Sequence, residues 1–300
     1  MVADKINKVS IVGGTHGNEF TGIYLVEKWQ QQPQLIARDG LTVETVFANP
    51  KAHGENKRYI DSDLNRQFAS KDLADATLAN YEQSRAKVLH QHLGPKDAPN
   101  SDFVIDLHNT TSNMGPCLLL VQQDPVYNLL AGYLKMKMPE AVIFRDEDHL
   151  AKDQHHLLAS CGRFGVIVEV GPQSQSVIRQ DVFEQMETMT GHILDFIQLY
   201  SDDALPELPK QVEAYLYLES LTLPVDEQGR RTAMVHSRVQ DHDFEAIHPG
   251  DPIFRSFNGE DISYQGEKVV YPAFINEAAY YDNNLAMSLM EKVTIKVYGD

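Results

Sequence analysis

Short apolar runs alternate with longer amphipathic stretches along roughly the first two thirds of the chain. Residues 8–12 are rich in apolar and β-branched side chains and run into Gly13 and Gly14, which predicts a buried strand ending in a tight turn. From residue 19 to residue 31, apolar side chains recur at near-helical spacing, which predicts a helix. A strand, a glycine turn and a helix in succession are the opening unit of an α/β fold.

The alternation continues beyond this unit, although a long polar loop over residues 51–70 interrupts it. Further strands are predicted at residues 42–48, 102–107, 117–121, 141–144 and 165–170, and further helices at residues 74–93, 127–136 and 182–200. This order predicts a mostly parallel central sheet flanked by helices. Ligands bind beyond the carboxyl ends of the strands in such sheets, so functional residues are expected at strand ends.

The pattern changes after residue 201. Residues 202–210 are polar and contain Pro206 and Pro209, which predicts a linker. Beyond the linker, strand-like runs alternate with turns at residues 212–218, 232–235, 246–254, 269–275 and 292–297. We therefore expect two domains, a catalytic α/β domain over residues 1–205 and a smaller β-rich domain over residues 206–300.

The chain has 300 residues and a formal net charge of -17, with 26 Lys and Arg residues against 43 Asp and Glu residues. This excess argues against binding to a nucleic-acid backbone, which requires a basic surface. It also means that an anionic substrate requires a local cluster of cations.

The number of cysteines and the length of the hydrophobic runs bear on the cellular compartment of the protein. Cys117 and Cys161 are too few for a disulfide framework, which favours reduced thiols. The first residues contain no apolar signal segment, and no apolar run approaches the ~18 residues that cross a bilayer. We expect a cytoplasmic protein that does not enter a membrane. Homo-oligomers are common among soluble enzymes, so a homo-oligomer is a possible state.

Two predicted strand ends carry histidines. His16 and Glu19 lie three residues apart at the junction of the first strand and the first helix, so one helical turn brings them to one side. His108 ends the third predicted strand. Two histidines and a glutamate with one open position form a known catalytic zinc set, in which zinc lowers the pKa of bound water to about 7. Taken singly, each residue also fits a structural role in a turn, at a helix start or on a backbone carbonyl.

Glu169 ends an almost wholly apolar strand. A carboxylate in such a position is costly unless it is paired or used, and burial raises its pKa toward the range that suits a general base. A carboxylate hydrogen-bonded to backbone amides explains the same pattern, and both interpretations stay open.

The polar loop contains Arg58, Asn65 and Arg66. In so acidic a chain, two arginines and an asparagine close together indicate an anion clamp, because arginine binds carboxylates through two parallel hydrogen bonds. Arginine also stabilises a developing oxyanion. The alternative is that the arginines pair with Asp61 and Asp63 on an exposed loop. Tyr280 in the second domain is a further candidate, either as a hydrogen-bond donor to substrate or as part of a packed aromatic pair.

These segments together resemble the aspartoacylase family, within the succinylglutamate desuccinylase and aspartoacylase group of zinc-carboxypeptidase-like enzymes. The resemblance extends from residue 13 to residue 281 and is carried by the segments GGTHGNE, ANPKA, RYIDSDLNR, DLHNTTSNMG, VEVGPQ, HPGDPIF and YPAFINEAAYY. It implies a zinc-dependent amidohydrolase that converts an N-acyl L-amino acid, with N-acetyl-L-aspartate as first choice, to a carboxylate and a free amino acid.

The resemblance also assigns roles to individual residues. One zinc ion per chain would be held by His16, Glu19 and His108. Glu169 would be the general base, and Arg58 would polarise the acyl carbonyl. Three residues would complete the substrate site: Asn65 and Arg66 would bind the α-carboxylate, and Tyr280 would close the site from the second domain. Glu277 would support that region through hydrogen bonds.

One position departs from the aspartate-specific members of the family. They are expected to carry an arginine ten residues before the general base, where this chain has Ala159. Arg163 is the nearest cation that could bind an acidic side chain instead. An aminoacylase for N-acyl aromatic or other amino acids and a succinylglutamate desuccinylase are therefore alternatives. A non-catalytic binding protein is a remote one, since all four metal and base positions are filled.

Overall fold

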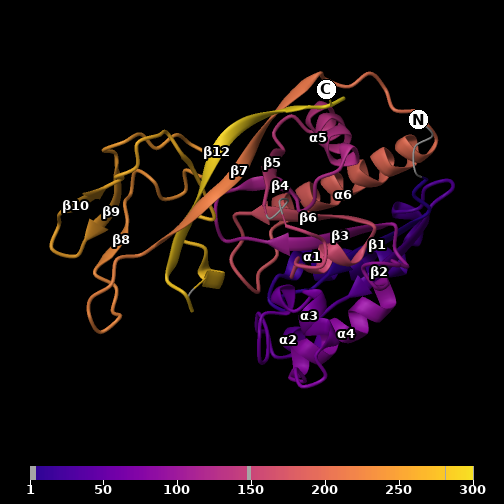
Figure 1. Cartoon of the computed structure of the whole chain (residues 1–300), viewed down its shortest axis with the longest axis horizontal. Coiled ribbons are helices and arrows are strands. Elements are labelled where there is room, and N and C mark those ends of the chain that lie inside the picture. The colour runs from indigo at the N-terminus through magenta and orange to yellow at the C-terminus, as the bar shows by residue number, and fades with distance from the viewer. Residues whose placement is uncertain (1–4, 147–149, 281, 300) are drawn as a thin grey trace.

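A computed structural model describes residues 5–146, 150–280 and 282–299 (Figure 1). Within these residues, nine strands form one sheet. Their order across the sheet is β11 (Tyr271–Ala273), β12 (Leu285–Lys296), β7 (Gln211–Thr222), β5 (Val142–Arg145), β4 (Gly115–Leu120), β6 (Phe164–Gly171), β3 (Phe103–Asn109), β1 (Lys8–Gly13) and β2 (Thr42–Phe47). A second, three-stranded sheet contains β8 (Ala233–Val235), β9 (Pro252–Ser256) and β10 (Asp261–Ser263).

The larger sheet is mostly parallel. Strands β2, β1, β3 and β6 are parallel neighbours, as are β4 and β5 and β5 and β7. Strand β4 runs antiparallel to β6, and β12 runs antiparallel to both β7 and β11. The expected fold class is therefore confirmed: a mostly parallel α/β sheet flanked by helices, with a β-rich C-terminal part.

Three helices cover one face of this sheet: α1 (Phe20–Gln31), α5 (Pro125–Lys137) and α6 (Gln180–Ser201). Trp29 of α1, Leu130 of α5 and Ile193 of α6 are buried in one hydrophobic cluster with Ile105 of β3 and Val168 of β6. Alternate residues of a strand point to opposite faces, so His108 on β3 and Glu169 on β6 face away from these helices.

Helix α4 (Tyr81–Leu93) lies over the opposite face, where Leu89 packs with Val12, Leu64, Val104 and Leu158. The short helices α2 (Pro50–Gly54) and α3 (Ser70–Ala74) precede it. The chain also forms 3-10 turns at Pro33–Leu35, Leu64–Arg66, Leu158–Cys161 and Ala278–Tyr280.

Some predicted boundaries are wrong. The helix predicted at residues 74–93 begins only at Tyr81, because Asn80 caps it: the Asn80 side chain accepts from the Gln83 amide and the Gln83 side chain accepts from the Asn80 amide. The loop predicted at residues 51–70 contains helix α2 and a 3-10 turn. The run at residues 246–254 forms a strand only from Pro252 onward.

The C-terminal strands extend the main sheet and also leave it. Strand β7 pairs with β5 through Phe144 and Tyr215, and the long β7 and β12 strands then lead to the small β8–β10 sheet (Figure 1). A separate hydrophobic cluster that includes Val235, Phe254 and Ile275 lies in this region. The division into domains at residue 205 stays a prediction.

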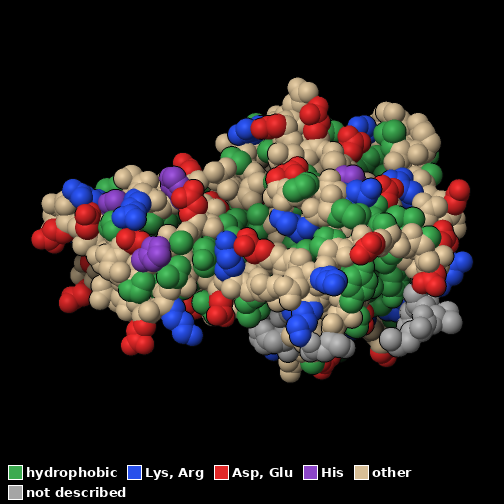
Figure 2. Space-filling model, turned by 90° about the horizontal axis from the view of Figure 1, so that it is seen from above, with side chains coloured by type: hydrophobic (Ala, Val, Ile, Leu, Met, Phe, Trp, Pro, Cys, Tyr) green, Lys and Arg blue, Asp and Glu red, His purple; other side chains and the backbone are tan. Residues whose placement is uncertain are grey.

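The surface shows no gathering of positive charge on the face drawn in Figure 2, where acidic and basic side chains are interspersed. Within residues 5–146, 150–280 and 282–299, none of the helices combines the length and the apolar character that crossing a bilayer requires.

Candidate metal and catalytic site

The turn between β1 and α1 positions His16 and Glu19. Gly14 has a φ of +72°, a conformation that a side chain disfavours. Gly17 passes so close to the Ala52–His53 backbone that an added Cβ would lie 2.2 Å from the His53 nitrogen. The glycines of the turn therefore let the chain fold tightly enough to bring His16 back over the sheet.

Strands β3 and β6 position His108 and Glu169. His108 and Glu169 are register partners on these neighbouring parallel strands, so they stand side by side on the same face of the sheet. His108 lies within β3, one residue before its end, and Glu169 lies two residues before the end of β6. The structure thus brings the predicted histidine and the predicted base together.

His16, Glu19 and His108 form one buried cluster that could hold a metal ion, with one ligand atom from each within 4.8 Å of the others. Nδ1 of His16 lies 2.7 Å from Oε1 of Glu19, and Nδ1 of His108 lies 3.0 Å from Oε2 of the same carboxylate. The two Nδ1 atoms are 3.2 Å apart. Two imidazole nitrogens and one carboxylate are the donors of many catalytic zinc sites, so the donor set fits zinc.

Each histidine is held from behind by an aspartate. Nε2 of His16 lies 3.0 Å from Asp63, and Nε2 of His108 lies 2.9 Å from Asp106. The Thr15 hydroxyl donates to the other oxygen of Asp106, which is fully buried. A carboxylate that accepts a hydrogen bond from Nε2 favours the ring tautomer with its proton on Nε2. The electron pair of Nδ1 is then free to bind a metal ion.

Charge within the cluster shifts its titration. Burial raises the pKa of Glu19, but His16 and His108 outweigh burial and bring that pKa below its usual range. Burial lowers the pKa of His108, but Asp106 and Glu19 outweigh burial and raise it well above its usual value. A cation among these groups replaces the stabilisation that the histidine protons otherwise supply.

Glu169 lines the same cavity, and its carboxylate has no hydrogen-bond partner among the described residues, although the residue is only 8% exposed. The alternative that backbone amides neutralise it is therefore not observed. Burial raises the pKa of Glu169 well above its usual value, His108 and Arg58 oppose this, and the negative charges of Glu19 and Glu277 add to it. A buried carboxylate with free electron pairs is suited to accept a proton.

Arg58 reaches the cluster from the polar loop. Its guanidinium donates to Glu19 at 3.0 Å and to Asp63 at 3.2 Å. The expected alternative pairing with Asp63 is thus present, together with a contact to a metal-ligand candidate. Glu82, fully buried on α4, accepts from the backbone amides of residues 60, 61 and 62 and so holds this loop in place.

Asn65 and Arg66 follow on the same loop. The Asn65 side chain accepts from the Leu158 amide at 2.8 Å, and its Nδ2 lies 3.5 Å from Nε2 of His108. The Arg66 guanidinium donates to the Asn65 carbonyl at 2.9 Å, and its charge reaches both Asp63 and Tyr280. The two residues thus lie beside the cluster, where an anionic substrate group needs cations.

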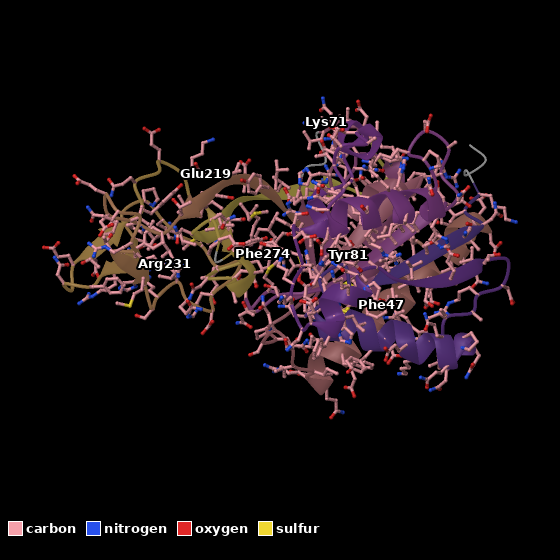
Figure 3. The ribbon with its side chains drawn as sticks, turned by 90° about the horizontal axis from the view of Figure 1, so that it is seen from below. Phe47, Lys71, Tyr81, Glu219, Arg231 and Phe274 are labelled. Carbon is pink, nitrogen blue, oxygen red and sulfur yellow. The ribbon has the colours of Figure 1, made fainter. Side chains whose placement is uncertain are left out.

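Residues from the C-terminal part close the cavity on its remaining side. Phe274, Glu277 and Tyr280 line it together with Glu169. Glu277 accepts from the Thr110 hydroxyl and from the Thr111 amide, the latter at 2.7 Å. Figure 3 shows Phe274 at the junction between the C-terminal strands and the rest of the molecule. These contacts are the geometric support for the prediction that the C-terminal part contributes residues to the substrate site.

Comparisons with known proteins agree with this geometry. Residues 5–197 match the model of the succinylglutamate desuccinylase/aspartoacylase catalytic domain, and residues 210–292 match the AstE/AspA barrel-sandwich hybrid domain. The chain belongs to the succinylglutamate desuccinylase/aspartoacylase family.

Relatives in this family carry two different names. A probable aspartoacylase of Trichodesmium erythraeum is 42% identical over 98% of this chain and 99% of its own length. An N-acyl-aromatic-L-amino acid amidohydrolase of Rattus norvegicus is also 42% identical, over 97% of this chain and 92% of its own. The crystal structure of murine aminoacylase 3 superposes with a TM-score of 0.92 at 38% identity and covers 98% of both chains.

The position that departs from the aspartate-specific family members is apolar in its surroundings. Ala159 is fully buried in a cluster with Phe144, Leu157 and Ile167, and Phe274 of the cavity wall belongs to the same cluster.

Arg163 does not lie in the site. It sits just before β6, six residues ahead of Glu169, which is about 20 Å along an extended strand. Its guanidinium donates to the Lys5 carbonyl at 2.7 Å and lies 3.4 Å from Asp102. The expectation that Arg163 replaces the missing arginine therefore finds no support in the structure.

Asp63, Asp106 and Glu82 were not singled out from the sequence as functional residues. Asp106 had a signal, because a residue two positions before His108 on a strand shares its face. Asp63 and His16 are 47 positions apart in the sequence, and Glu82 is about 20 positions from the loop residues that it contacts. Local spacing does not reveal such pairs.

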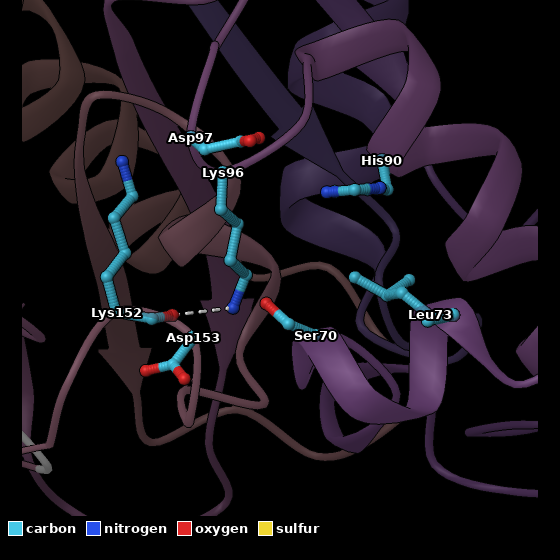
Figure 4. Close-up of a pocket in the computed structure, with 8 residues that line it drawn as sticks. Ser70, Leu73, His90, Lys96, Asp97, Lys152 and Asp153 are labelled. Atoms are coloured by element: carbon cyan, nitrogen blue, oxygen red, sulfur yellow. Dashed lines mark hydrogen bonds between the residues drawn. The ribbon is translucent and has the colours of Figure 1, made fainter.

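The space at the metal cluster is small. The cavity there has a volume of about 30 Å³. A cavity of about 670 Å³ lies elsewhere, lined by Ser70, His90, Lys96 and Lys152 among others (Figure 4). It contains none of the predicted site residues.

Proposed function

We propose that this chain is a zinc-dependent amidohydrolase that deacylates an N-acyl L-amino acid to a carboxylate and a free amino acid. One zinc ion per chain would be held by His16, Glu19 and His108. The observation that carries the proposal is the position of Glu169: a buried carboxylate without a hydrogen-bond partner among the described residues, in the same cavity as the three ligand candidates.

The proposed chemistry moves one proton. Bound zinc would act as a Lewis acid toward the acyl carbonyl and would lower the pKa of a water molecule. Glu169 would accept the proton of the water that attacks the acyl carbon, and would then deliver it to the amide nitrogen as the C–N bond breaks. The raised pKa of Glu169 supports the first transfer, because a stronger base accepts the proton more readily.

Three residues of the polar loop would orient the substrate. The Arg58 guanidinium lies on Glu19 and would polarise the acyl oxygen. Asn65 and Arg66 would bind the α-carboxylate, for which the guanidinium offers two parallel donors. Tyr280 would complete the wall opposite Glu169. These cations also answer the requirement that a chain of net charge -17 must attract an anion locally.

The surroundings of Ala159 favour an apolar or aromatic amino acid over aspartate. An acidic side chain needs a cation, and a carboxylate placed without a partner among Phe144, Leu157 and Ile167 would lose several kcal/mol of hydration. The relative from Rattus norvegicus is named for aromatic substrates, which supports the same choice. N-acetylaspartate and succinylglutamate remain the competing substrates for the assay.

The test is a substrate panel on the zinc-loaded, the chelated and the Glu169→Gln protein. We expect hydrolysis of N-acetyltyrosine, loss of activity on chelation, recovery with zinc, and turnover reduced at least 100-fold in Glu169→Gln with zinc still bound. Glu219→Gln, which changes an exposed carboxylate far out on β7, is the matched control (Figure 3). Unchanged hydrolysis after chelation would refute the metal role, and unchanged turnover in Glu169→Gln would refute the base.

A further inference from the structure

The segment from Ala273 to Tyr280 carries the C-terminal wall of the site. Phe274, Glu277 and Tyr280 all line the cavity next to Glu169, and they come from this one stretch of chain. Its placement relative to the first part of the chain therefore sets the shape of the substrate site.

The backbone of this segment is held in an uncommon conformation. Phe274 has a φ of +53° and Asn276 a φ of +52°, so two non-glycine residues adopt left-handed geometry on either side of Ile275. For a bulky side chain such as phenylalanine this conformation is unfavourable, and it persists only where surrounding contacts impose it. Those contacts are visible at Ile275.

The backbone amide and the backbone carbonyl of Ile275 each form a hydrogen bond with a side chain. Its amide donates to Oδ1 of Asp243 at 3.2 Å, and its carbonyl accepts from the Ser112 hydroxyl at 3.0 Å. Asp243 lies in the C-terminal part, whereas Ser112 follows β3 only four residues after His108. The two side chains form a clamp that ties the segment to the strand carrying a metal-ligand candidate.

A second layer of contacts supports Asp243. The Phe244 amide next to it donates to the Pro272 carbonyl at 2.7 Å, and the Asn276 side chain donates to Gln240 at 3.2 Å. The Asn113 side chain donates to the carbonyl of Asp241 at 2.8 Å. Residues 240–244 thus lie against the segment and against the loop after β3 at the same time.

The electrostatic setting of Asp243 makes its grip depend on pH. Burial raises its pKa to about 7, although the hydrogen bond from the Ile275 amide opposes the shift; Oδ2 of the same carboxylate has no hydrogen-bond partner among the described residues. Asp241 adds to the rise from the same loop, and buried Cys117 on β4 also faces the carboxylate. The charged form, present above neutral pH, is the stronger acceptor for the Ile275 amide.

We propose that Asp243 is a positioning residue for catalysis: by holding the Ile275 amide opposite Ser112, it fixes Phe274, Glu277 and Tyr280 in the wall of the substrate site. Asp243 is not among the residues that line the site cavity, so it would act through the segment alone. The kinetic part of this inference rests on the proposed deacylase function, and the structural part does not.

Three measurements test the proposal on the full zinc-loaded protein. In Asp243→Ala we expect faster amide exchange over residues 273–280 by mass spectrometry, because the Ile275 amide loses its acceptor. We also expect kcat/KM to fall at least about tenfold, mostly through KM, at unchanged zinc content. In Asp243→Asn the acceptor remains without the charge, so kcat/KM should be about threefold below wild type at pH 8 and equal to it at pH 6.

Two further variants separate positioning from general destabilisation. Asp241→Asn is the matched control at pH 8, where Asp243 is charged with or without Asp241; its side chain contacts Gln240 and not the segment, so exchange and kcat/KM should equal those of wild type at that pH. Ser112→Ala should reproduce the faster exchange, and the double variant with Asp243→Ala should cost less than the sum of the two.

The outcomes are distinct. Unchanged exchange in Asp243→Ala would overturn the clamp whatever the activity. The positioning role would be overturned by two results together. The activity of Asp243→Ala would fall only in proportion to the loss of folded protein or bound zinc, and the ratio of kcat/KM between Asp243→Asn and wild type would not change with pH. Asp243 would then be a structural residue. A wild-type protein without deacylase activity would refute the proposed function and leave exchange to decide the clamp.

Discussion

Nε2 of His108 lies 2.9 Å from Oδ2 of Asp106, while Nδ1 of the same ring faces Glu19 at 3.0 Å. The aspartate therefore keeps the ring proton on Nε2 and turns the electron pair of Nδ1 toward the metal cluster. Because Asp106 and His108 are two apart on β3, the strand itself aligns them.

The substitution Asp106→Asn should weaken zinc binding. The side-chain amide that it introduces would offer a hydrogen to Nε2 of His108, which favours the ring tautomer with its proton on Nδ1 and removes a ligand. We expect zinc affinity to fall about 10–100-fold, measured by competition with a chromophoric chelator. Asp195→Asn on α6, whose carboxylate pairs with Arg38, is the control. Equal affinities would show that the Asp106 contact does not tune the ligand.

Glu169→Gln should give a protein that is inactive yet more stable. The pKa of Glu169 is raised on folding, so ionisation favours the unfolded chain, and stability falls as pH rises from about 4.5 through the folded pKa. The variant avoids this cost. Above that window we expect the zinc-free variant to melt roughly 2–5 °C higher than the zinc-free wild type. Below pH ~4 the two should melt together, and a gap that persisted there would have another origin.

Activity should decrease at low pH, because the same carboxylate becomes protonated there. Glu169 must be ionised to accept a proton, so kcat/KM should fall as pH drops through its pKa. Burial and the charges of Glu19 and Glu277 place that pKa above the usual range of a glutamate. A zinc ion nearby opposes this rise, so the acid limb of the zinc-loaded enzyme should lie below the pKa of Glu169 in the zinc-free protein. Steady-state rates from pH 5 to 9 give this limb.

Ala159→Arg should shift specificity toward acidic substrates. The new guanidinium would enter the apolar cluster of Phe144, Leu157 and Phe274, where it repels an aromatic side chain and attracts a carboxylate. We expect the kcat/KM ratio of N-acetylaspartate to N-acetyltyrosine to rise at least about tenfold. A buried unpaired cation also costs stability, so the melting temperature should fall without acidic substrate. Ala159→Met fills similar space without charge, and an equal shift in that variant would point to volume alone.

Much of the fold was predictable because its strands are buried on both faces and therefore appear as continuous apolar runs, as at β1 and β6. The predicted helix before β3 was too long, because the sequence between α3 and Tyr81 has helical composition and only the Asn80–Gln83 cap marks the true start. The three ligand candidates and Glu169 were predictable because each lies near a strand end. Contacts such as Asp63 with His16, Asp243 with Ile275 and Glu82 with the polar loop join distant parts of the chain, and only the folded geometry reveals them.

Lys96→Met should impair substrate binding from a distance. The Lys96 ammonium donates to the carbonyls of Lys152 and His155, at 3.0 and 2.6 Å, beside the cavity of Figure 4. The loop that it holds continues to Leu158, whose amide donates to Asn65 at 2.8 Å. Because Asn65 is a proposed carboxylate ligand, loosening this loop should raise KM about three- to tenfold and leave kcat largely unchanged.

The same variant has a pH signature in stability. Burial lowers the pKa of Lys96 to about 8, against the weaker opposing effect of Cys161, so the charged amine disfavours folding. That cost is full below pH 8 and disappears as pH rises toward the unfolded value of about 10.5, and wild-type stability gains over this window. Lys96→Met removes the titration but leaves two carbonyls without a donor, which costs about 1–3 kcal/mol. Its deficit relative to wild type should therefore widen between pH 8 and 10 in denaturant titrations, and a deficit independent of pH would show that Lys96 keeps its ordinary pKa.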